Sequence, residues 1–243
     1  MSETVSYGFE EVAPAEKTRR VTSVFERVAK RYDIMNDLMS GGLHRGWKDE
    51  FVRMVQPRAG EAILDMAGGT GDIAFRMAGK GASVTVADIN PAMLDVGRER
   101  AAKRGIERLV WAEENAETLT FADAAFNAYT IGFGIRNVTD IPAALRSAHR
   151  VLKYGGRFFC LEFSTTEWPG FRDIYDAYSH RIVPQIGKFV ARDEEAYRYL
   201  VESIRRFPPM AEFADMIAAA GFSRVASRPI LGGLVAIHSG WKA

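Results

Sequence analysis

The sequence predicts an α/β fold built on a mostly parallel sheet of seven strands. From about residue 62 onward, short apolar runs alternate with segments of helical periodicity, which is typical of βαβ units. One of these runs passes directly into a glycine-rich turn and then into a helix. At 243 residues, of which 47% are hydrophobic and 26% charged, the chain has the size and composition of one globular domain.

The part of the chain ahead of the sheet is predicted to be mainly helical. Residues 1–17 are polar, acidic and aperiodic, and we interpret them as a flexible tail before a single domain at residues 18–243. Apolar residues recur at helical spacing over residues 21–32 and again over residues 45–55. Pro57–Gly60 ends the second helical segment.

The elements of the sheet follow in order. Five strands are expected at Ala62–Met66, Ser83–Ala87, Leu109–Ala112, Ala128–Phe133 and Arg157–Phe163. Helices are expected between them near Asp72–Ala78, Pro91–Arg104 and Ile141–Leu152. A helix at about Met210–Ala220 and two strands, at Phe222–Pro229 and Leu234–Gly240, complete the pattern.

The region Phe171–Arg206 departs from this alternation. It is rich in charge and in tyrosines such as Tyr175 and Tyr178, and we expect a helical insertion over about residues 165–206. Open α/β sheets bind ligands in the crevice at the carboxyl ends of their strands. Because the insertion follows the fifth strand, it lies over that crevice, and we interpret it as a lid.

Charge, cysteine content and hydropathy exclude several classes of protein. Lys and Arg number 32 and Asp and Glu 31, a net charge of +1 that argues against a nucleic-acid partner. The single cysteine, Cys160, excludes an intrachain disulfide and a multi-cysteine zinc site, so we expect a reducing, cytoplasmic location and no metal. The longest uncharged stretches, Ala124–Ile135 and Pro229–Trp241, fall short of the about 20 apolar residues that span a bilayer.

The strongest motif is the glycine-rich turn within Ile63–Asp72. Gly68, Gly69 and Gly71 allow positive φ and close approach of a ligand to the backbone, and the following helix supplies free N–H donors. The spacing matches neither the dinucleotide fingerprint nor a P-loop. An acidic residue just before the glycines, Asp65, favours a cationic or hydroxyl-bearing ligand over a pyrophosphate.

Polar residues also end the next two strands. Asp88 stands at the tip of the second strand, where a carboxylate can accept both hydroxyls of a ribose. Asn115 and Ala116 follow the third strand, where an amide and backbone groups can bind an adenine edge. Tight turns capped by Asp and Asn would explain each feature alone. Because all three lie at the same edge of the sheet, we favour a nucleoside cofactor, although Asp65 can also serve the turn itself.

This order of acid, glycines, acid and asparagine resembles that of class I S-adenosylmethionine-dependent methyltransferases. The resemblance implies a Rossmann-like fold and S-adenosylmethionine as the cofactor. The positions that carry over as cofactor-binding residues are Thr70, Asp88, Asn115 and Ala116. Gly68 and Asp65 join them from the glycine turn itself.

Three further segments narrow the class. They are Tyr32-Asp33-Ile34-Met35-Asn36 with Ser40-x-x-x-His44-x-x-Trp47, Gly134-Ile135-Arg136-Asn137-Val138, and Arg150–Gly156 leading into Leu161–Ser164. From Val24 to Trp241 the chain thus resembles the ubiquinone/menaquinone-biosynthesis C-methyltransferase family. Tyr154 stands where a proline is usual, Gly132 where serine is common, and Phe207–Pro209 replaces a His-Pro pattern.

The family resemblance implies methylation of a ring carbon on a polyprenyl benzoquinol or demethylmenaquinol. It also implies peripheral contact with the inner face of a membrane, and either a homo-oligomer or a quinone-biosynthesis complex. A quinol carbon is a poor nucleophile until a neighbouring hydroxyl, with a pKa of about 10, loses its proton. The resemblance assigns this activation to Arg136 and Asn137, with Arg136 as an electrostatic stabiliser because arginine stays protonated.

Several roles stay open from the sequence. Arg136 can instead form a salt bridge to the lid or the N-terminal helix. Water is the expected proton acceptor, with His44 or Tyr32 nearby, although His44 is more often structural. Cys160 is interpreted as buried filler, and Glu162 as the anchor of a loop.

Two other functions fit the cofactor motif. One is an O- or N-methyltransferase of another small molecule, and the other is a non-catalytic S-adenosylmethionine-binding component of a quinone-synthesis complex. A non-catalytic component of this kind would have no chemical reason to keep the Arg136–Asn137 pair. A nucleic-acid methyltransferase fits less well, because no Asn/Asp-Pro-Pro-aromatic turn follows the fourth strand and Cys160 is preceded by Phe159 and not by proline.

Overall fold

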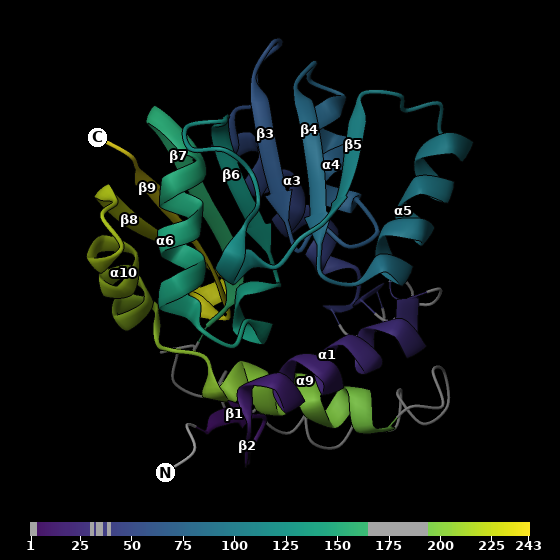
Figure 1. Cartoon of the computed structure of the whole chain (residues 1–243), viewed down its shortest axis with the longest axis vertical. Helices are drawn as coiled ribbons and strands as arrows, with labels where there is room; N and C mark the ends of the chain where they lie inside the picture. The colour runs from purple at the N-terminus through teal and green to yellow at the C-terminus, as the bar shows by residue number, and fades with distance from the viewer. Residues whose placement is uncertain (1–3, 30–31, 33–35, 38–39, 165–193) are drawn as a thin grey trace.

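The computed structural model describes residues 4–29, 32, 36–37, 40–164 and 194–243 (Figure 1). The predicted lid up to residue 193, with Tyr175 and Tyr178, lies outside these residues. The last part of the predicted insertion, residues 194–206, forms a helix.

Seven strands form one sheet in the order β5-β4-β3-β6-β7-β9-β8. They are β3 (Ala62–Met66), β4 (Ser83–Asp88), β5 (Leu109–Glu113), β6 (Phe126–Gly132), β7 (Leu152–Phe163), β8 (Ser223–Ile230) and β9 (Val235–Trp241). Strands β5, β4, β3, β6 and β7 pair in parallel, whereas β9 pairs antiparallel with β7 and β8. The predicted seven-stranded, mostly parallel sheet is confirmed. Strand β7 begins earlier than predicted because Leu152 already pairs with Phe126 across a bulge.

Helices cover both faces of this sheet and its lower edge (Figure 1). They are α1 (Pro14–Val28), α3 (Leu43–Val55), α4 (Asp72–Ala78), α5 (Pro91–Lys103), α6 (Ile141–Val151), α9 (Glu194–Arg206) and α10 (Met210–Ala219). Short 3-10 turns lie at η2 (Ala116–Thr118), η3 (Ile135–Asn137) and η6 (Leu231–Gly233). Helices α6 and α10 pack on one face, and α3 and α4 pack on the other.

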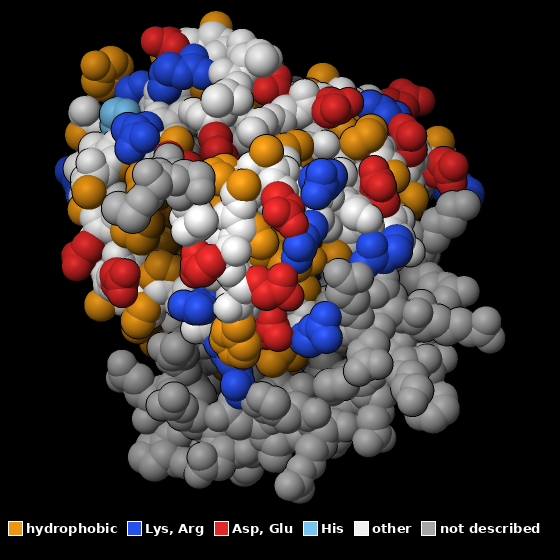
Figure 2. Space-filling model, turned by 60° about the horizontal axis from the view of Figure 1, so that its bottom comes forward, with side chains coloured by type: hydrophobic (Ala, Val, Ile, Leu, Met, Phe, Trp, Pro, Cys, Tyr) orange, Lys and Arg blue, Asp and Glu red, His pale blue; other side chains and the backbone are white. Residues whose placement is uncertain are grey.

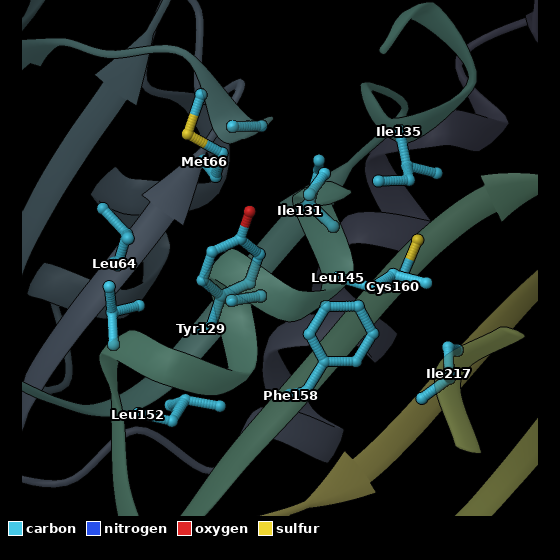
Figure 3. Packing of buried hydrophobic residues seen from close by; sticks show 14 of the residues in the cluster. Leu64, Met66, Tyr129, Ile131, Ile135, Leu145, Leu152, Phe158, Cys160 and Ile217 are labelled. Carbon is cyan, nitrogen blue, oxygen red and sulfur yellow. The ribbon is translucent and has the colours of Figure 1, made fainter. Parts of the chain in front are cut away.

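The two faces of the sheet follow from the alternation of side chains along each strand. On the α6 face, the rings of Tyr129 and Phe158 stack with centroids 5.6 Å apart in a cluster that includes Leu64 (Figure 3). On the opposite face, Ile63 packs in the cluster formed with α3 and α4. Because Asp65 lies two residues after Ile63, it shares the face that α3 and α4 cover.

The N-terminal residues correct the interpretation of residues 1–17 as a tail without regular structure. They form an antiparallel hairpin, β1 (Val5–Tyr7) and β2 (Glu10–Val12), and the first turn of α1. Tyr7 and Val12 are buried in a cluster with residues of α1 and α9, the latter almost two hundred residues away in the sequence. Local periodicity cannot reveal partners at that separation, which is why the hairpin was not expected.

Helix α1 crosses the edge where the parallel strands end, beside α9 (Figure 1). Two hydrogen bonds hold it there. The Asn90 side chain donates to the Thr22 carbonyl at 3.0 Å, and Lys17 Nζ donates to the Val138 carbonyl at 2.9 Å. The carboxyl edge is therefore covered by the helix that the sequence predicts ahead of the sheet.

Candidate functional site

The turn between β3 and α4 has the open backbone that the glycine motif predicts. Gly71, at φ +81°, adopts the left-handed conformation that favours glycine and directly precedes α4. Gly68 is needed for a different reason. A Cβ at this position would lie 2.7 Å from Val86 Cγ1 and 3.1 Å from Asp65 Oδ2. Glycine therefore keeps the space beside the Asp65 carboxyl group free.

A cavity lies between this turn and α1, with about 1060 Å³ of atom-free space, part of it open to solvent. Thr18, Thr22 and Phe25 of α1 form one wall, and the turns after β3, β4, β5 and β6 form the other. The predicted site residues that line it are Asp65, Gly68, Thr70, Asp88, Asn115, Ala116 and Asn137.

Asp65 is the most unusual group in this cavity. Its side chain is buried, with the residue 1% exposed, and Oδ1 accepts a hydrogen bond from Thr130 Oγ1 at 2.7 Å. Its Oδ2 makes no hydrogen bond within the described residues. Burial raises the pKa of Asp65 to about 7, although the Thr130 hydrogen bond and the charge of Lys48 oppose the shift. A buried carboxylate oxygen without a partner is costly and suits a donor from a ligand.

Asp88 and Asn115 both cap turns and line the cavity. Asp88 accepts backbone hydrogen bonds from Gly69 and Asn90, each at 2.9 Å, and burial raises its pKa to about 6 despite these bonds. Asn115 Oδ1 accepts the Glu117 N–H at 2.9 Å, which leaves the amide NH₂ as the remaining donor of that side chain. The capping role and a role toward a ligand are therefore compatible.

Contacts within the protein constrain two further positions that line the cavity, Thr70 and Gly132. Thr70 is buried, and its Oγ1 accepts a hydrogen bond from Arg100 Nη1 at 2.6 Å. Gly132, where the family commonly has serine, also lines the cavity. A Cβ at Gly132 would lie 2.3 Å from Ile73 Cδ1, so the isoleucine occupies the space that a serine side chain would need.

The sequence analysis missed Lys48 as a residue of this cavity. It lies on α3, is 6% exposed, and its Nζ lies 2.8 Å from Asp72 Oδ2. Both residues line the cavity. Although burial opposes the shift, Lys48 and Arg76 hold the pKa of Asp72 well below its usual range. The available signal was a lysine within the apolar stripe of an amphipathic helix, beside Trp47 and Phe51.

A second, smaller cavity, with about 360 Å³ of atom-free space that includes open solvent, adjoins the first. It lies between α1, η3 and α9, and Phe25, Tyr32 and Asn137 line both cavities. The remaining lining residues are Val24, Val28, Asn36, Arg136, Ala196, Tyr199 and Leu200. Because Asn137 stands at their junction, it faces both spaces.

Arg136 lines the smaller cavity and forms a buried ion pair. Its Nη1 donates to Glu162 Oε1 at 2.8 Å and to the Phe133 carbonyl at 2.6 Å, and the guanidinium lies 5.6 Å from the Phe163 ring centroid. Glu162 is fully buried, and burial raises its pKa although Arg136 opposes the shift. Among the described residues, the partner is therefore on β7, and not on the N-terminal helix that the alternative interpretation of Arg136 named. Arg136 Nε is buried without a hydrogen bond in the described part of the chain.

Asn137 is held by a residue that the sequence analysis did not single out for this role. Tyr199 Oη donates to Asn137 Oδ1 at 3.1 Å. The Tyr199 ring stacks on Tyr7 of the hairpin, with centroids 4.5 Å apart. Burial raises the pKa of Tyr199, so it remains a protonated donor at neutral pH. The hairpin and α9 thus position one of the predicted catalytic side chains.

The other residues that the sequence singled out are Tyr32, His44 and Cys160. Tyr32 lines both cavities, and burial raises the pKa of its phenol despite the nearby charge of Arg136. His44 Nδ1 lies 2.8 Å from Ser40 Oγ, and burial lowers its pKa. Cys160 is buried in the sheet, as interpreted from the sequence. His44 is not among the residues lining either of these two cavities.

Comparison with known proteins agrees with this picture. The model of the ubiE/COQ5 methyltransferase family matches residues 13–242. The ubiquinone/menaquinone biosynthesis C-methyltransferase UbiE of Zymomonas mobilis is 66% identical over 240 residues, 99% of each chain. The protein of the same name from Bradyrhizobium diazoefficiens is 56% identical over 247 residues, 99% of this chain and 98% of the relative.

Solved structures are similar in fold at low sequence identity. A SAM-dependent methyltransferase from Aquifex aeolicus has a TM-score of 0.59 at 14% identity and covers 81% of this chain and 89% of its own. Phosphoethanolamine N-methyltransferase 2 of Haemonchus contortus, in complex with S-adenosyl-L-methionine, has a TM-score of 0.60 at 13% identity, over 81% of this chain and 52% of its own. These similarities confirm the predicted Rossmann-like class I methyltransferase fold.

Proposed function

The chain belongs to the ubiE/COQ5 methyltransferase family, and from that premise we propose how its two cavities divide the reaction. The protein is an S-adenosylmethionine-dependent C-methyltransferase of ubiquinone and menaquinone biosynthesis. Family membership favours carbon over oxygen or nitrogen as the methyl acceptor, and an enzyme over a silent cofactor-binding copy. The larger cavity takes the cofactor, and the quinol ring binds where the smaller cavity adjoins it, beside Arg136 and Asn137.

The residues of the larger cavity fit S-adenosylmethionine. The unpartnered Asp65 Oδ2, with the space that Gly68 leaves beside it, suits the ammonium group of the cofactor. Asp88 retains acceptor capacity for the ribose hydroxyls, and Asn115 with Ala116 can bind the adenine edge. Thr70, the remaining predicted cofactor-binding residue, also lines this cavity. When bound, the cofactor supplies a methyl group that its sulfonium already activates.

The protein's part in the chemistry is alignment and charge stabilisation. Asn137 lines both cavities, so it can bind a quinol oxygen while the ring carbon faces the cofactor. Arg136 offers the Nε hydrogen that lacks a partner among the described residues. Donors of this kind favour the phenolate and lower the pKa of the quinol hydroxyl. Burial keeps Tyr32 a phenol, and a water molecule takes the proton of the quinol hydroxyl.

The observation that carries this assignment is the junction at Asn137, where the cavity with the cofactor residues meets the cavity with Arg136. The test is transfer of a labelled methyl group to a short-chain demethyl quinol. We expect the label on a ring carbon, and label on oxygen would contradict the reaction.

Arg136→Met should lower kcat by about 100- to 1000-fold, the loss seen when one stabilising donor is removed. Its affinity for S-adenosylhomocysteine should stay within about twofold, because Arg136 is not among the residues lining the larger cavity. Arg98→Met, on the exposed side of α5, is the matched control and should change neither quantity. An unchanged rate in Arg136→Met would leave the Arg136–Glu162 pair purely structural.

We also propose that the protein works in the cytoplasm, in peripheral contact with the inner face of the membrane that holds its polyprenyl substrate. No helix of the described residues is long and apolar enough to span a bilayer. Phe9, at the turn of the hairpin, is 53% exposed, and the Arg206 guanidinium lies 5.8 Å from its ring. Figure 2 brings the bottom of Figure 1 forward. On the described part of this face, Lys and Arg side chains are interspersed with Asp and Glu side chains.

Flotation with phospholipid vesicles tests this contact. The protein should float with the vesicles, and Phe9→Ser should weaken the association. Recovery of all the protein in the lipid-free fraction would contradict the proposal. From the family resemblance we also propose that the protein forms a homo-oligomer or joins a quinone-biosynthesis complex. Light scattering, which measures the mass of the assembly, tests this proposal.

A further inference from the structure

We propose that Lys48 binds the carboxylate of the cofactor's amino-acid moiety, beside Asp65, which binds its ammonium group. This inference rests on the proposed placement of S-adenosylmethionine in the larger cavity. Lys48 is not one of the cofactor-binding residues predicted from the sequence. Together with Asp65 it would bind an α-amino acid zwitterion.

The fold brings Lys48 and Asp65 to the same end of the cavity. Asp65 lies on the face of β3 that α3 and α4 cover, because its neighbour in the alternation, Ile63, packs in that cluster. Lys48 lies on the buried side of α3 with Trp47 and Phe51. Both Lys48 and Asp65 line the cavity, and the charge of Lys48 acts on the Asp65 carboxyl group.

The hydrogen bonds of Lys48 leave room for a second anion. An ammonium group has three N–H donors. One of them serves Asp72 Oδ2 at 2.8 Å, and Lys48 makes no other hydrogen bond in the described part of the chain. Asp72 in turn accepts a hydrogen bond from Arg76 Nη1, with 2.5 Å between Nη1 and Oδ1. Because two cations share the Asp72 carboxylate, it does not fully compensate the buried charge of Lys48.

The two unsatisfied groups are complementary to a zwitterion. Asp65 Oδ2 is a buried acceptor without a donor, and Lys48 is a buried cation with spare donors. An amino acid presents its ammonium and carboxylate on one carbon atom, so it can bind both groups at once. An uncharged thioether or a nucleoside alone would leave Asp65 Oδ2 without a donor and would not use the remaining donors of Lys48.

The competing explanation is that Lys48 only links α3 to α4 through Asp72. Calorimetry with two ligands separates the explanations: S-adenosylhomocysteine, and its decarboxylated analogue, which keeps the amine. Lys48→Met should weaken binding of S-adenosylhomocysteine by about 10- to 100-fold, the loss expected for a hydrogen bond between charged groups. It should leave affinity for the decarboxylated analogue within about twofold. Lys80→Met, the same change at an exposed lysine, should alter neither affinity.

Asp65→Asn supplies the complementary readout. It should weaken both ligands, because both carry the amine. Asp72→Asn removes the negative charge from the link between α3 and α4 and keeps Lys48 in place, so it should preserve or increase the preference for S-adenosylhomocysteine over the analogue. Should Lys48→Met fail to fold, this preference in Asp72→Asn decides the question by itself.

Three results would overturn the inference. Lys48→Met could bind S-adenosylhomocysteine as tightly as the unmodified protein, or it could lose both ligands equally. The third is that Asp72→Asn loses the preference for the carboxylate-bearing ligand. If the unmodified protein binds neither ligand, the proposed cofactor site fails, and that outcome is distinct from failure of Lys48 alone.

Discussion

Replacing Asp65 by asparagine should stabilise the unliganded protein at alkaline pH while it weakens cofactor binding. The carboxyl group is buried, and one of its oxygens has no hydrogen bond among the described residues. Asparagine keeps the acceptor for Thr130 and removes the charge. The cost of holding an ionised group in this place therefore disappears with the substitution.

The magnitude follows from the pKa of Asp65, which burial raises from 3.8 to about 7. A raised carboxyl pKa means that the folded protein holds the proton more tightly than the unfolded chain. The stability that this proton contributes is fully present below about pH 4 and is lost as the pH rises through 7. Each unit in this window is worth about 1.4 kcal/mol, so the difference between Asp65→Asn and the unmodified protein should grow by about 3 kcal/mol from pH 5 to pH 8.

Urea unfolding at a series of pH values measures this difference directly, because other titrating groups contribute to both proteins. Asp95→Asn, an exposed aspartate on α5, is the control and should show a small difference that is nearly constant with pH. A difference for Asp65→Asn that does not change between pH 5 and pH 8 would refute the reasoning, since it would mean that Asp65 ionises as easily in the folded protein as in the unfolded chain.

Three further measurements probe the same site. Affinity for S-adenosylhomocysteine should fall by up to about tenfold per unit as the pH drops below about 7, because Asp65 must be ionised to hold an ammonium; calorimetry showing constant affinity from pH 5 to pH 8 would contradict this. Glu162→Gln should reduce the free energy of unfolding by about 3 kcal/mol or more and lower kcat, because it leaves the Arg136 charge buried without its partner. Unchanged values in denaturation and turnover assays would show that the pair contributes neither to stability nor to catalysis. Gly132→Ser should cost about 1 kcal/mol in urea unfolding because it displaces the end of Ile73, and Ile73→Val should remove most of that cost; a cost that persists would point elsewhere.

The sheet and the cofactor edge could be predicted because their signals are local. A parallel strand buried on both faces is a continuous apolar run, and a glycine turn that needs positive φ is recognisable in a few residues. The polar residues that follow successive parallel strands, such as Asp88 and Asn115, meet at one edge by topology alone. The structure places both in the same cavity.

The contacts that the sequence could not predict depend on register or on distant partners. The Arg136–Glu162 pair forms because the turn after β6 reaches back to β7, and neither residue's neighbours indicate that contact. Tyr199 reaches Asn137 only because α9 packs against the hairpin and α1. Lys48 is placed by the rotation of α3 about its axis, which the apolar stripe fixes but which no short motif records.

The electrostatics of the two cavities differ in a way that suits transfer between opposite charges. Burial raises the pKa values of Asp65 and Asp88 in the larger cavity, which disfavours their ionised forms until a cation enters and stabilises them. In the smaller cavity, Glu162 compensates the Arg136 charge. The donors of Arg136 and of Asn137, whose Oδ1 accepts a hydrogen bond from Tyr199, favour an oxyanion without an excess of free positive charge. Methyl transfer from a sulfonium to a phenolate-activated ring removes both charges. Because a low dielectric penalises separated charges more than neutral products, the burial of the groups around Asn137 favours this loss of charge.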